Sequence, residues 1–514
     1  LHFQQETKHF SSMSIKNLKE ISSLVTKPRN VYQSQFVENE IIGDASKHQR
    51  LIDGLFRDEW ENDLDAEIEI YGKKVGGKTF EMLKTRAKDR LISLIFQSDA
   101  SKIFNGDGEK SLFSACKCLL SGLLLFYKEK FNSGSDQLKQ AIKIARSFEH
   151  TEIELIALRS LRQYAGFSGN EKQYYKFNDE IKHAFDKLKA EMTAQELNQD
   201  LHLELVKSVE LSDQWKQTLE INYFRMRELI KEHDSTLIRI NAYKLFVRYH
   251  QVREEYEEAI RFGLEFKQYL QGSNYRFVKN RIAEISLNNL YNSLFLRDYQ
   301  RGNQYALECE ELYDSGSITW LIFKEYHFLL CMHMSQHGKA SQIFDQVRKH
   351  SSFESYPAPN VEKWRIFEAY LEYAEPISSP NRGRFNISKF LNEVPVFSKD
   401  KEGYNLTIII AQMLLAVKTN ELHRVVDREE SLKVYLSRYI QKDKHARSYY
   451  FLKMLQVMIR YDFDPAKTSQ IADKFFIKMK QSGQASPETS EIIPYEWLWT
   501  DLMLRLRENH SQNH

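Results

Sequence analysis

Proline is almost absent from most of this chain. None occurs between Pro28 and Pro357, although average usage near 5% would put roughly 16 in a stretch of that length. Proline inside a helix removes a backbone hydrogen bond and collides with the preceding turn, whereas loops and sheet edges tolerate it. Its absence therefore predicts a long series of consecutive helices.

Cysteine and an excess of charge are also lacking. The four cysteines, Cys116, Cys118, Cys309 and Cys331, are too few in 514 residues for a disulfide scaffold, so we expect a cytoplasmic protein. Lys and Arg total 73 against 71 Asp and Glu, for a net charge of +2. This balance gives no global attraction to nucleic acid, membranes or acidic ligands, so any electrostatic site must be local.

Long hydrophobic runs are missing too. The longest, Leu119–Tyr127 and Ile408–Val417, are about half of the ~20 residues that cross a bilayer. We therefore predict two buried central helices and no membrane span. The N-terminus lacks a basic region followed by an apolar core, which argues against a secretory signal.

Antiparallel pairs of helices are predicted from Ser111 onward. The first pair, Leu112–Lys128 and Gln137–Phe148, flanks a polar turn that contains Gly134. A second pair flanks the turn at Gly169–Asn170. Helices that are joined by a few turn residues must lie antiparallel.

A repeated pattern marks the later pairs. An aromatic ring precedes a small residue by three positions at Tyr256 and Ala259, Tyr299 and Gly302, and His337 and Ala340. The units recur at 43 and 38 residues, and each match is predicted to begin the second helix of a pair. The small residue lets two helix backbones approach closely, and the ring one turn earlier fills the gap between hairpins.

This pattern resembles the tetratricopeptide family. Tyr243, Tyr256 and Ala259 have the spacing of that family's aromatic, aromatic and small consensus positions, and Ala340 and Phe344 match in the third unit. The period exceeds the family's 34 residues, so we predict a divergent array, clearest at residues 236–350. The resemblance implies an α-solenoid whose concave surface binds a protein or peptide partner.

The likeness to the family is partial. Glu254 occupies the position of the family's inter-helix glycine, and Gly263 that of a large aromatic residue. Phe390–Asn405 and Ile492–Trp499 are similar to segments of uncharacterised bacterial helical-repeat proteins, a likeness that implies no activity.

Glycine and proline divide the chain into three predicted regions. A glycine-rich turn at Asn105–Gly108 ends an N-terminal helical region, residues 13–108. A cluster of prolines after Pro357 begins a C-terminal helical region, residues 357–514, and the repeats occupy residues 109–356. Within the C-terminal region, Asp464–Pro465 predicts a helix start, a cap followed by a first-turn proline.

The resemblance also indicates where a partner would bind. In tetratricopeptide arrays the first helix of each hairpin lines the concave face. Here, polar side chains that fall between apolar positions are expected to be exposed there; they are Asn241, Lys244, Arg248, Asn289 and Asn292. The alternative for any one of them is that it is merely solvated.

One motif suggests a nucleotide-binding switch or NTPase instead. The segment from Gly72 through Gly77 to Lys78 and Thr79 fits the phosphate-loop pattern, in which Lys78 reaches the phosphates and Thr79 holds magnesium. A strand-like Ile68–Ile70 precedes it, but residues Asp65–Ile70 alternate acids with aliphatics, which does not fit a buried parallel strand. No strand with a magnesium-binding aspartate follows, so we favour a lysine-rich turn and predict no cofactor.

A basic helix suggests a nucleic-acid-binding regulator as a further alternative. Lys84, Arg86, Lys88 and Arg90 follow the motif, opposite Leu83 and other apolar residues. The neutral net charge and the lack of interleaved aromatic rings favour a solvated face, so nucleic acid is a minor partner.

Metal and nucleophile patterns are weak. Cys116 and Cys118 point to different sides of a helix and lack the second ligand pair of a zinc site. A second group crowds one helix and its turn; it consists of His327, Cys331, His333 and His337. Because its two pairs face differently, core or groove histidines are favoured over a metal site. The sequence thus favours an all-α, non-enzymatic scaffold or adaptor, more than ~60% helical, with no catalytic residues and no metal.

Overall fold

The structure is a computed structural model that describes residues 14–25, 42–74, 78–104, 106–207, 213–273, 278–374, 390, 404–438, 440, 446–482 and 491–512. Helices take up 85% of these described residues, and no strand occurs among them. The predicted all-α class and helix content are therefore confirmed.

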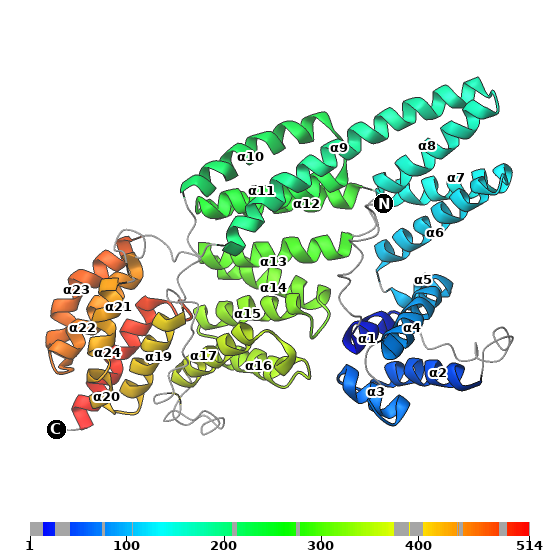
Figure 1. Ribbon diagram of the computed structural model, residues 1–514. Helices are drawn as coiled ribbons and strands as arrows, with labels where there is room; N and C mark the ends of the chain where they lie inside the picture. Colours follow the sequence, from blue (N-terminus) through cyan, green and yellow to red (C-terminus); the bar gives the residue numbers. More distant parts are fainter. Residues whose placement is uncertain are drawn as a thin grey trace. The chain divides into compact units, whose positions relative to one another are not determined.

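The helices are named in chain order (Figure 1). They are α1 (Ile15–Ser23), α2 (Ile42–Arg57), α3 (Asp63–Tyr71), α4 (Lys78–Gln97), α5 (Ala100–Ile103), α6 (Asp107–Tyr127), α7 (Phe131–Phe148), α8 (Thr151–Phe167), α9 (Glu171–Lys207), α10 (Asp213–Glu232), α11 (Thr236–Val252), α12 (Tyr256–Gly272), α13 (Val278–Leu296), α14 (Tyr299–Leu312), α15 (Ile318–His333), α16 (His337–Arg348), α17 (Ala358–Ala374), α19 (Tyr404–Lys418), α20 (Leu422–Val426), α21 (Glu429–Arg438), α22 (Ala446–Arg460), α23 (Pro465–Gln481) and α24 (Tyr495–Gln512).

Two compact units account for the described residues. Unit 1 contains the chain up to Thr193 together with Ser235–Leu237, and unit 2 contains the other described residues from Ala194 onward. The chain passes from unit 1 to unit 2 within α9. The three regions expected from glycine and proline stay a prediction.

In unit 1, α6 and α7 approach closely at a pair of glycines. A Cβ atom on Gly122 would lie 2.7 Å from the Leu138 side chain, and one on Gly134 would lie 2.4 Å from the Phe126 ring. The expectation that Gly134 lies in a turn is therefore wrong: it lies inside α7, and residues 128–130 form the turn. Here glycine serves a close helix contact rather than a chain reversal.

The hairpin turns share one backbone geometry. The residue two positions before the next helix has a positive φ; these residues are Glu129 (56°), Gly169 (69°), Glu254 (59°), Arg297 (57°), Ser335 (54°) and Asn420 (58°). In each turn the following residue donates its N–H to the carbonyl five positions earlier, as from Lys130 to Leu125 at 2.9 Å. This is a left-handed helix end, for which glycine is the usual residue.

The three aromatic-to-small matches lie where the sequence predicts them. Helices α12, α14 and α16 begin at Tyr256, Tyr299 and His337, and each packs against the preceding helix of its pair. The small residues Ala259, Gly302 and Ala340 are all buried. The second-helix starts are thus confirmed.

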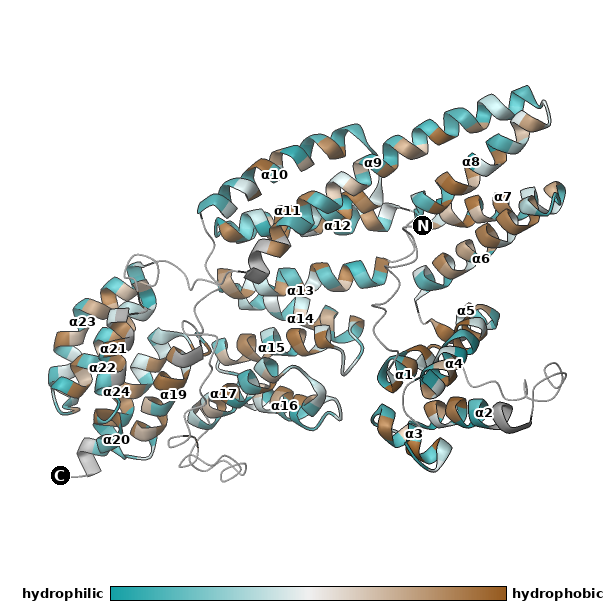
Figure 2. Ribbon diagram, in the orientation of Figure 1, coloured by the Kyte–Doolittle hydropathy of each residue, from teal (hydrophilic) through white to brown (hydrophobic). Residues whose placement is uncertain are grey.

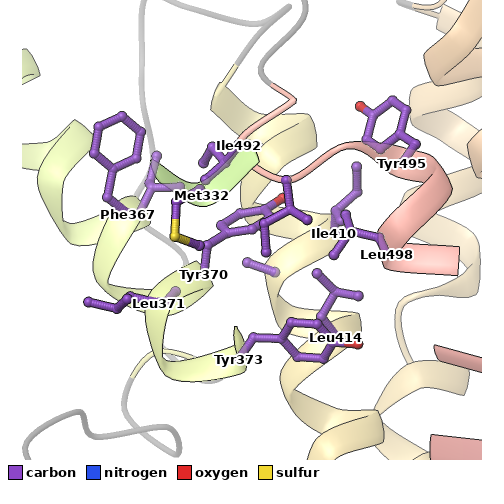
Figure 3. Packing of buried hydrophobic residues seen from close by; sticks show 14 of the residues in the cluster. Met332, Phe367, Tyr370, Leu371, Tyr373, Ile410, Leu414, Ile492, Tyr495 and Leu498 are labelled. Atoms are coloured by element: carbon purple, nitrogen blue, oxygen red, sulfur yellow. The ribbon is translucent and has the colours of Figure 1, made fainter. Parts of the chain in front are cut away.

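The largest hydrophobic core belongs to unit 2 and runs from α13 to α24. Figure 3 shows Tyr370 of α17 beside Ile410 of α19, with Leu498 of α24 on the far side of Ile410. The Tyr370 hydroxyl donates to the carbonyl oxygen of Thr407 at 3.1 Å. Helices α13–α16 and the helices of unit 2 after Pro357 therefore share one core.

Two helix predictions in the C-terminal region are confirmed. Helix α19 is apolar over most of its length (Figure 2), and Ile408–Val417 is buried apart from the half-buried Ile409. Asp464 caps α23, because its Oδ1 accepts from the backbone N–H groups of Ala466 and Lys467, and Pro465 is the first helical residue.

The matching expectation for Leu119–Tyr127 is wrong. This segment lies in α6, whose most apolar stretch has a mean hydropathy of 1.3 but is only 17% buried. Among the described residues, α6 is the one helix long and apolar enough to cross a bilayer. An apolar run in a sequence shows that the residues are hydrophobic, but not how many sides of the helix are covered. Here the run packs on one side only.

Candidate protein-interaction surface

The polar residues expected to bind a partner are mostly internal. Asn241, Asn289 and Asn292 are buried, whereas Arg248 is exposed and Lys244 is half-exposed, 3.7 Å from Glu284. The expectation of exposure is therefore wrong for the three asparagines. Asn289 and Asn292 are buried because α13 packs against α12, α14 and α15, so both of its sides are covered. Asn241 lies on α11, where its Oδ1 accepts from Asn198 Nδ2 of α9 at 3.4 Å.

The buried amides serve contacts between helices. The Oδ1 of Asn292 accepts from Gln251 Nε2 of α11 at 2.9 Å. The Asn289 amide occupies space that a side chain on Gly263 of α12 would need, since a Cβ there would lie 2.7 Å from its Oδ1. At position 263, where the sequence resemblance would place a large aromatic residue, an amide from α13 fills the volume instead.

The phosphate-loop motif joins two helices. Ile68–Ile70, expected to resemble a strand, is helical and belongs to α3. Gly72 ends α3 with a φ of 73°, Lys78 and Thr79 begin α4, and Gly77 lies outside the described residues. A phosphate loop normally follows a buried strand, so the observed context differs from the one that the motif requires. The absence of nucleotide binding stays a prediction.

The basic helix has one lysine on its buried side. Lys84 is fully buried in α4, and its Nζ lies 2.6 Å from Asp63 Oδ2 and 2.7 Å from Glu81 Oε1. The other oxygen of Asp63 accepts from the backbone N–H of Ile15 at 2.6 Å. Lys84 therefore joins α1, α3 and α4 and does not belong to an exposed basic face; Arg86 is exposed and Lys88 and Arg90 are half-exposed.

The thiols and histidines show no arrangement for metal binding or nucleophilic attack. Within the described ranges no three His, Cys, Asp or Glu side chains come together as metal ligands. Burial raises the pKa of Cys309 to about 12 and of Cys331 to about 11, and it also raises the pKa of Cys116 and Cys118. A raised pKa keeps a thiol mostly protonated at neutral pH, which makes it a weak nucleophile.

The two buried histidines of α15 have different surroundings. His333 donates from Nε2 to the carbonyl oxygen of Glu491 at 2.7 Å, and burial lowers its pKa to about 4. Burial lowers the pKa of His327 to about 3, and both of its ring nitrogens lack a hydrogen-bond partner. His337, also part of the group expected from sequence, is half-exposed at the start of α16.

A buried ionic cluster lies beside His333 in unit 2. Arg447 of α22 binds Glu491 through two contacts of 2.6 and 3.0 Å and Glu496 of α24 at 2.8 Å. Arg297 approaches Glu496 at 3.4 Å. Although burial alone would raise the pKa of Glu496, the hydrogen bond and charge of Arg447 lower it. The cluster joins the α13–α14 turn and α15 to α22 and α24, and it is not open to a ligand, because its central side chains are buried.

Five exposed aromatic side chains lie in unit 1, at the turns of two hairpins. We call this group the aromatic tip; it consists of Tyr127, Phe131, Phe167, Tyr174 and Tyr175. Tyr127 and Phe167 are 84% and 83% exposed, far more than such rings normally are. The α6–α7 and α8–α9 turns lie at the same end of this group of helices (Figure 1).

Ring contacts hold the two turns together. Phe131, at the start of α7, stacks on Tyr164 of α8 with 4.7 Å between ring centroids. Tyr164 also contacts Phe126 of α6 at 5.6 Å. On the other hairpin, the Tyr174 ring lies over Gly166, where a Cβ would be 3.5 Å away. Phe131 and Tyr174 therefore rest on packed neighbours, whereas Tyr127 and Phe167 project into solvent.

Lysines surround the aromatic tip. Lys128, Lys130, Lys172 and Lys176 are all exposed in or next to the two turns, against the two acids Glu129 and Glu171. The surroundings of the rings are therefore basic, although the whole chain is nearly neutral. A sequence signal for this surface exists: aromatic residues stand within four positions of both polar turns, Lys128–Lys130 and Ser168–Asn170.

Comparisons with known proteins add no identification. No protein-family model, no curated protein and no solved structure matches this chain.

Proposed function

We propose that this protein is a non-enzymatic scaffold or adaptor, a tetratricopeptide-like α-solenoid that binds a protein partner through the aromatic tip. The exposure of five aromatic rings at two turns that lie at the same end of a group of helices carries the proposal (Figure 1). Aromatic side chains bury a large apolar area for a small loss of conformational freedom, because they have only two rotatable side-chain bonds, and they dominate the energetics of protein interfaces. A contiguous exposed aromatic patch is rare on a protein that functions alone.

The lysines around the rings define the partner. An interface core of aromatic side chains is matched by an apolar pocket, and a basic rim is matched by acidic side chains. We therefore propose a partner that offers an apolar pocket bordered by Asp or Glu. Such a rim would speed association and make it sensitive to salt.

Paired variants test the proposed surface. Phe167→Ser with Tyr175→Ser removes two exposed rings, and Phe224→Ser removes a 52% exposed ring of α10 as a matched control. Proteins captured from the native cells are compared by quantitative mass spectrometry, and the protein lost with the tip variant is purified and titrated by calorimetry. We expect at least about tenfold weaker binding by the tip variant, with wild-type affinity for Phe224→Ser.

A different result would show that the interface lies elsewhere. If the tip variant binds its partner as the wild type does, the aromatic tip is not the binding surface. If the charge reversals Lys244→Glu and Arg248→Glu abolish binding instead, the partner contacts α11, as the sequence resemblance implies. Melting temperatures within a few degrees of the wild type show that each variant is folded.

A further inference from the structure

Helix α6 presents an apolar stripe to solvent. Leu112, Cys116, Leu120 and Leu124 are all exposed and recur every fourth residue, so they lie along one face. The opposite face packs on α7 through the buried Ala115 and Gly122. We call the four exposed residues the α6 stripe.

The stripe is an unusual outer surface for a helical array. The outer face of the first or last helix in such an array is normally polar, because it has no further helix to cover it. Hydrophobic side chains spaced every four residues form a ridge that fits the groove of another helix. The α6 stripe thus has the pattern of a helix contact whose second helix is absent from the described residues.

The charges at the two ends of α6 indicate what that second helix is. The start of α6 has one more acid than base, with Asp107, Glu109 and Lys110, and Asp107 is exposed. The end and the turn after it have one more base than acid, with Lys128, Glu129 and Lys130, all exposed. A helix with this polarity is complementary to itself when it is turned end for end.

We propose that the α6 stripe binds the α6 stripe of a second copy of this chain, in antiparallel orientation. With the twofold axis midway between Cys116 and Leu120, Cys116 of one copy faces Leu120 of the other, and Leu112 faces Leu124. The acidic start of each helix then meets the basic end of the other. The opposed helix dipoles add to the attraction.

The size of the stripe sets the strength of this dimer. Four half-exposed side chains cover less than the ~800 Å² that each partner contributes to a standard stable interface. The dimer is therefore reversible and forms at micromolar concentrations rather than at nanomolar ones. The acidic start of the second α6 meets Lys128 and Lys130, which also border the aromatic tip, so the dimer and the proposed partner would share these two lysines.

Sedimentation of the full chain from about 1 to about 100 µM measures the association. We expect the wild type to shift from monomer to dimer and Leu120→Glu to associate about tenfold more weakly or worse, because the charge would be buried without a partner. Leu307→Glu, at a 56% exposed leucine of α14, is the matched control and should dimerise like the wild type. A wild type that stays monomeric over this range would overturn the proposal.

A crosslink tests the orientation without relying on a disruptive variant. In Leu120→Cys, oxidation with copper phenanthroline should join Cys116 of one copy to the new thiol of the other, giving a dimer on a non-reducing gel. The same variant with Cys116→Ser should give much less of it. A wild-type dimer that is joined directly through Cys116 would indicate parallel helices and contradict the proposed register.

The apolar length of α6 makes a lipid surface the rival occupant. The wild type at a concentration where it is monomeric is therefore sedimented with mixed phosphatidylcholine and phosphatidylserine vesicles. We expect it to stay in the supernatant. If it binds the vesicles and Leu120→Glu does not, the stripe is a membrane contact and the dimer proposal is wrong.

Discussion

Single residues hold the helices together through partners that are distant in sequence. Lys324 of α15 is buried, and its Nζ lies 2.7 and 2.8 Å from the two carboxylate oxygens of Glu310 and 2.9 Å from Gln346. Lys84 has the same role in unit 1 with Asp63. A lysine in a sequence is expected at the surface, so neither burial could be predicted without knowing which carboxylate the fold brings near.

His327 provides a test at this scale. Burial, with a smaller effect of Lys339 and Lys324, lowers its pKa to about 3, below the ordinary 6.5. The unfolded chain therefore binds a proton more readily between pH 6.5 and 3, and the folded state loses stability as pH falls through this window. Because His327→Leu cannot bind that proton and removes two ring nitrogens without partners, we expect it to be at least as stable as the wild type at pH 7.

At pH 5 the difference should grow to about 2 kcal/mol in favour of His327→Leu. Thermal melts at pH 7.5 and pH 5 measure it, and His183→Leu, at an exposed position of α9, is the control. Equal loss of melting temperature in the wild type and in His327→Leu would show that His327 does not titrate as a buried group.

At the scale of elements, a matched pair of substitutions tests the left-handed backbone geometry of the turns. Gly169 has a φ of 69° with open space around a Cβ, whereas Ser335 has nearly the same φ of 54°. A side chain in this left-handed region costs roughly 1 kcal/mol relative to glycine. We therefore expect Gly169→Ala to lower the unfolding free energy by about this amount and Ser335→Gly to raise it. Differential scanning calorimetry checks both; shifts of the same sign would contradict the shared turn geometry.

Helix starts were predictable where short-range chemistry decides them. Tyr256, Tyr299 and His337 begin helices because a ring and a small residue one turn apart suit a hairpin contact, and Asp464 with Pro465 is a local cap. Gly134 was misplaced because glycine suits both turns and close helix contacts. The exposure of the α6 stripe and the burial of Asn289 depend on which helices pack beside them. Local residue spacing does not carry this information.

At the scale of the molecule, the core of unit 2 continues across the predicted boundary at Pro357. Met332 of α15 precedes that boundary, and Tyr370 of α17, Ile410 of α19 and Leu498 of α24 follow it, yet all four belong to one core (Figure 3). Lys418 of α19 also contacts the carboxylate of Glu372 on α17 at 3.9 Å. Helices that share a core tend to open together.

Leu498→Ala should therefore also destabilise helices other than α24. Leu498 is buried in α24, and removing its side chain leaves a cavity that costs about 2–5 kcal/mol. Because α17, α19 and α24 line the same core, we expect backbone amides of all three to exchange faster with deuterium in the variant, measured by mass spectrometry. Leu504→Ala, at a 51% exposed position of the same helix, should leave exchange unchanged. Faster exchange confined to α24 would mean that this helix opens alone, so the shared core would not make α17, α19 and α24 unfold cooperatively.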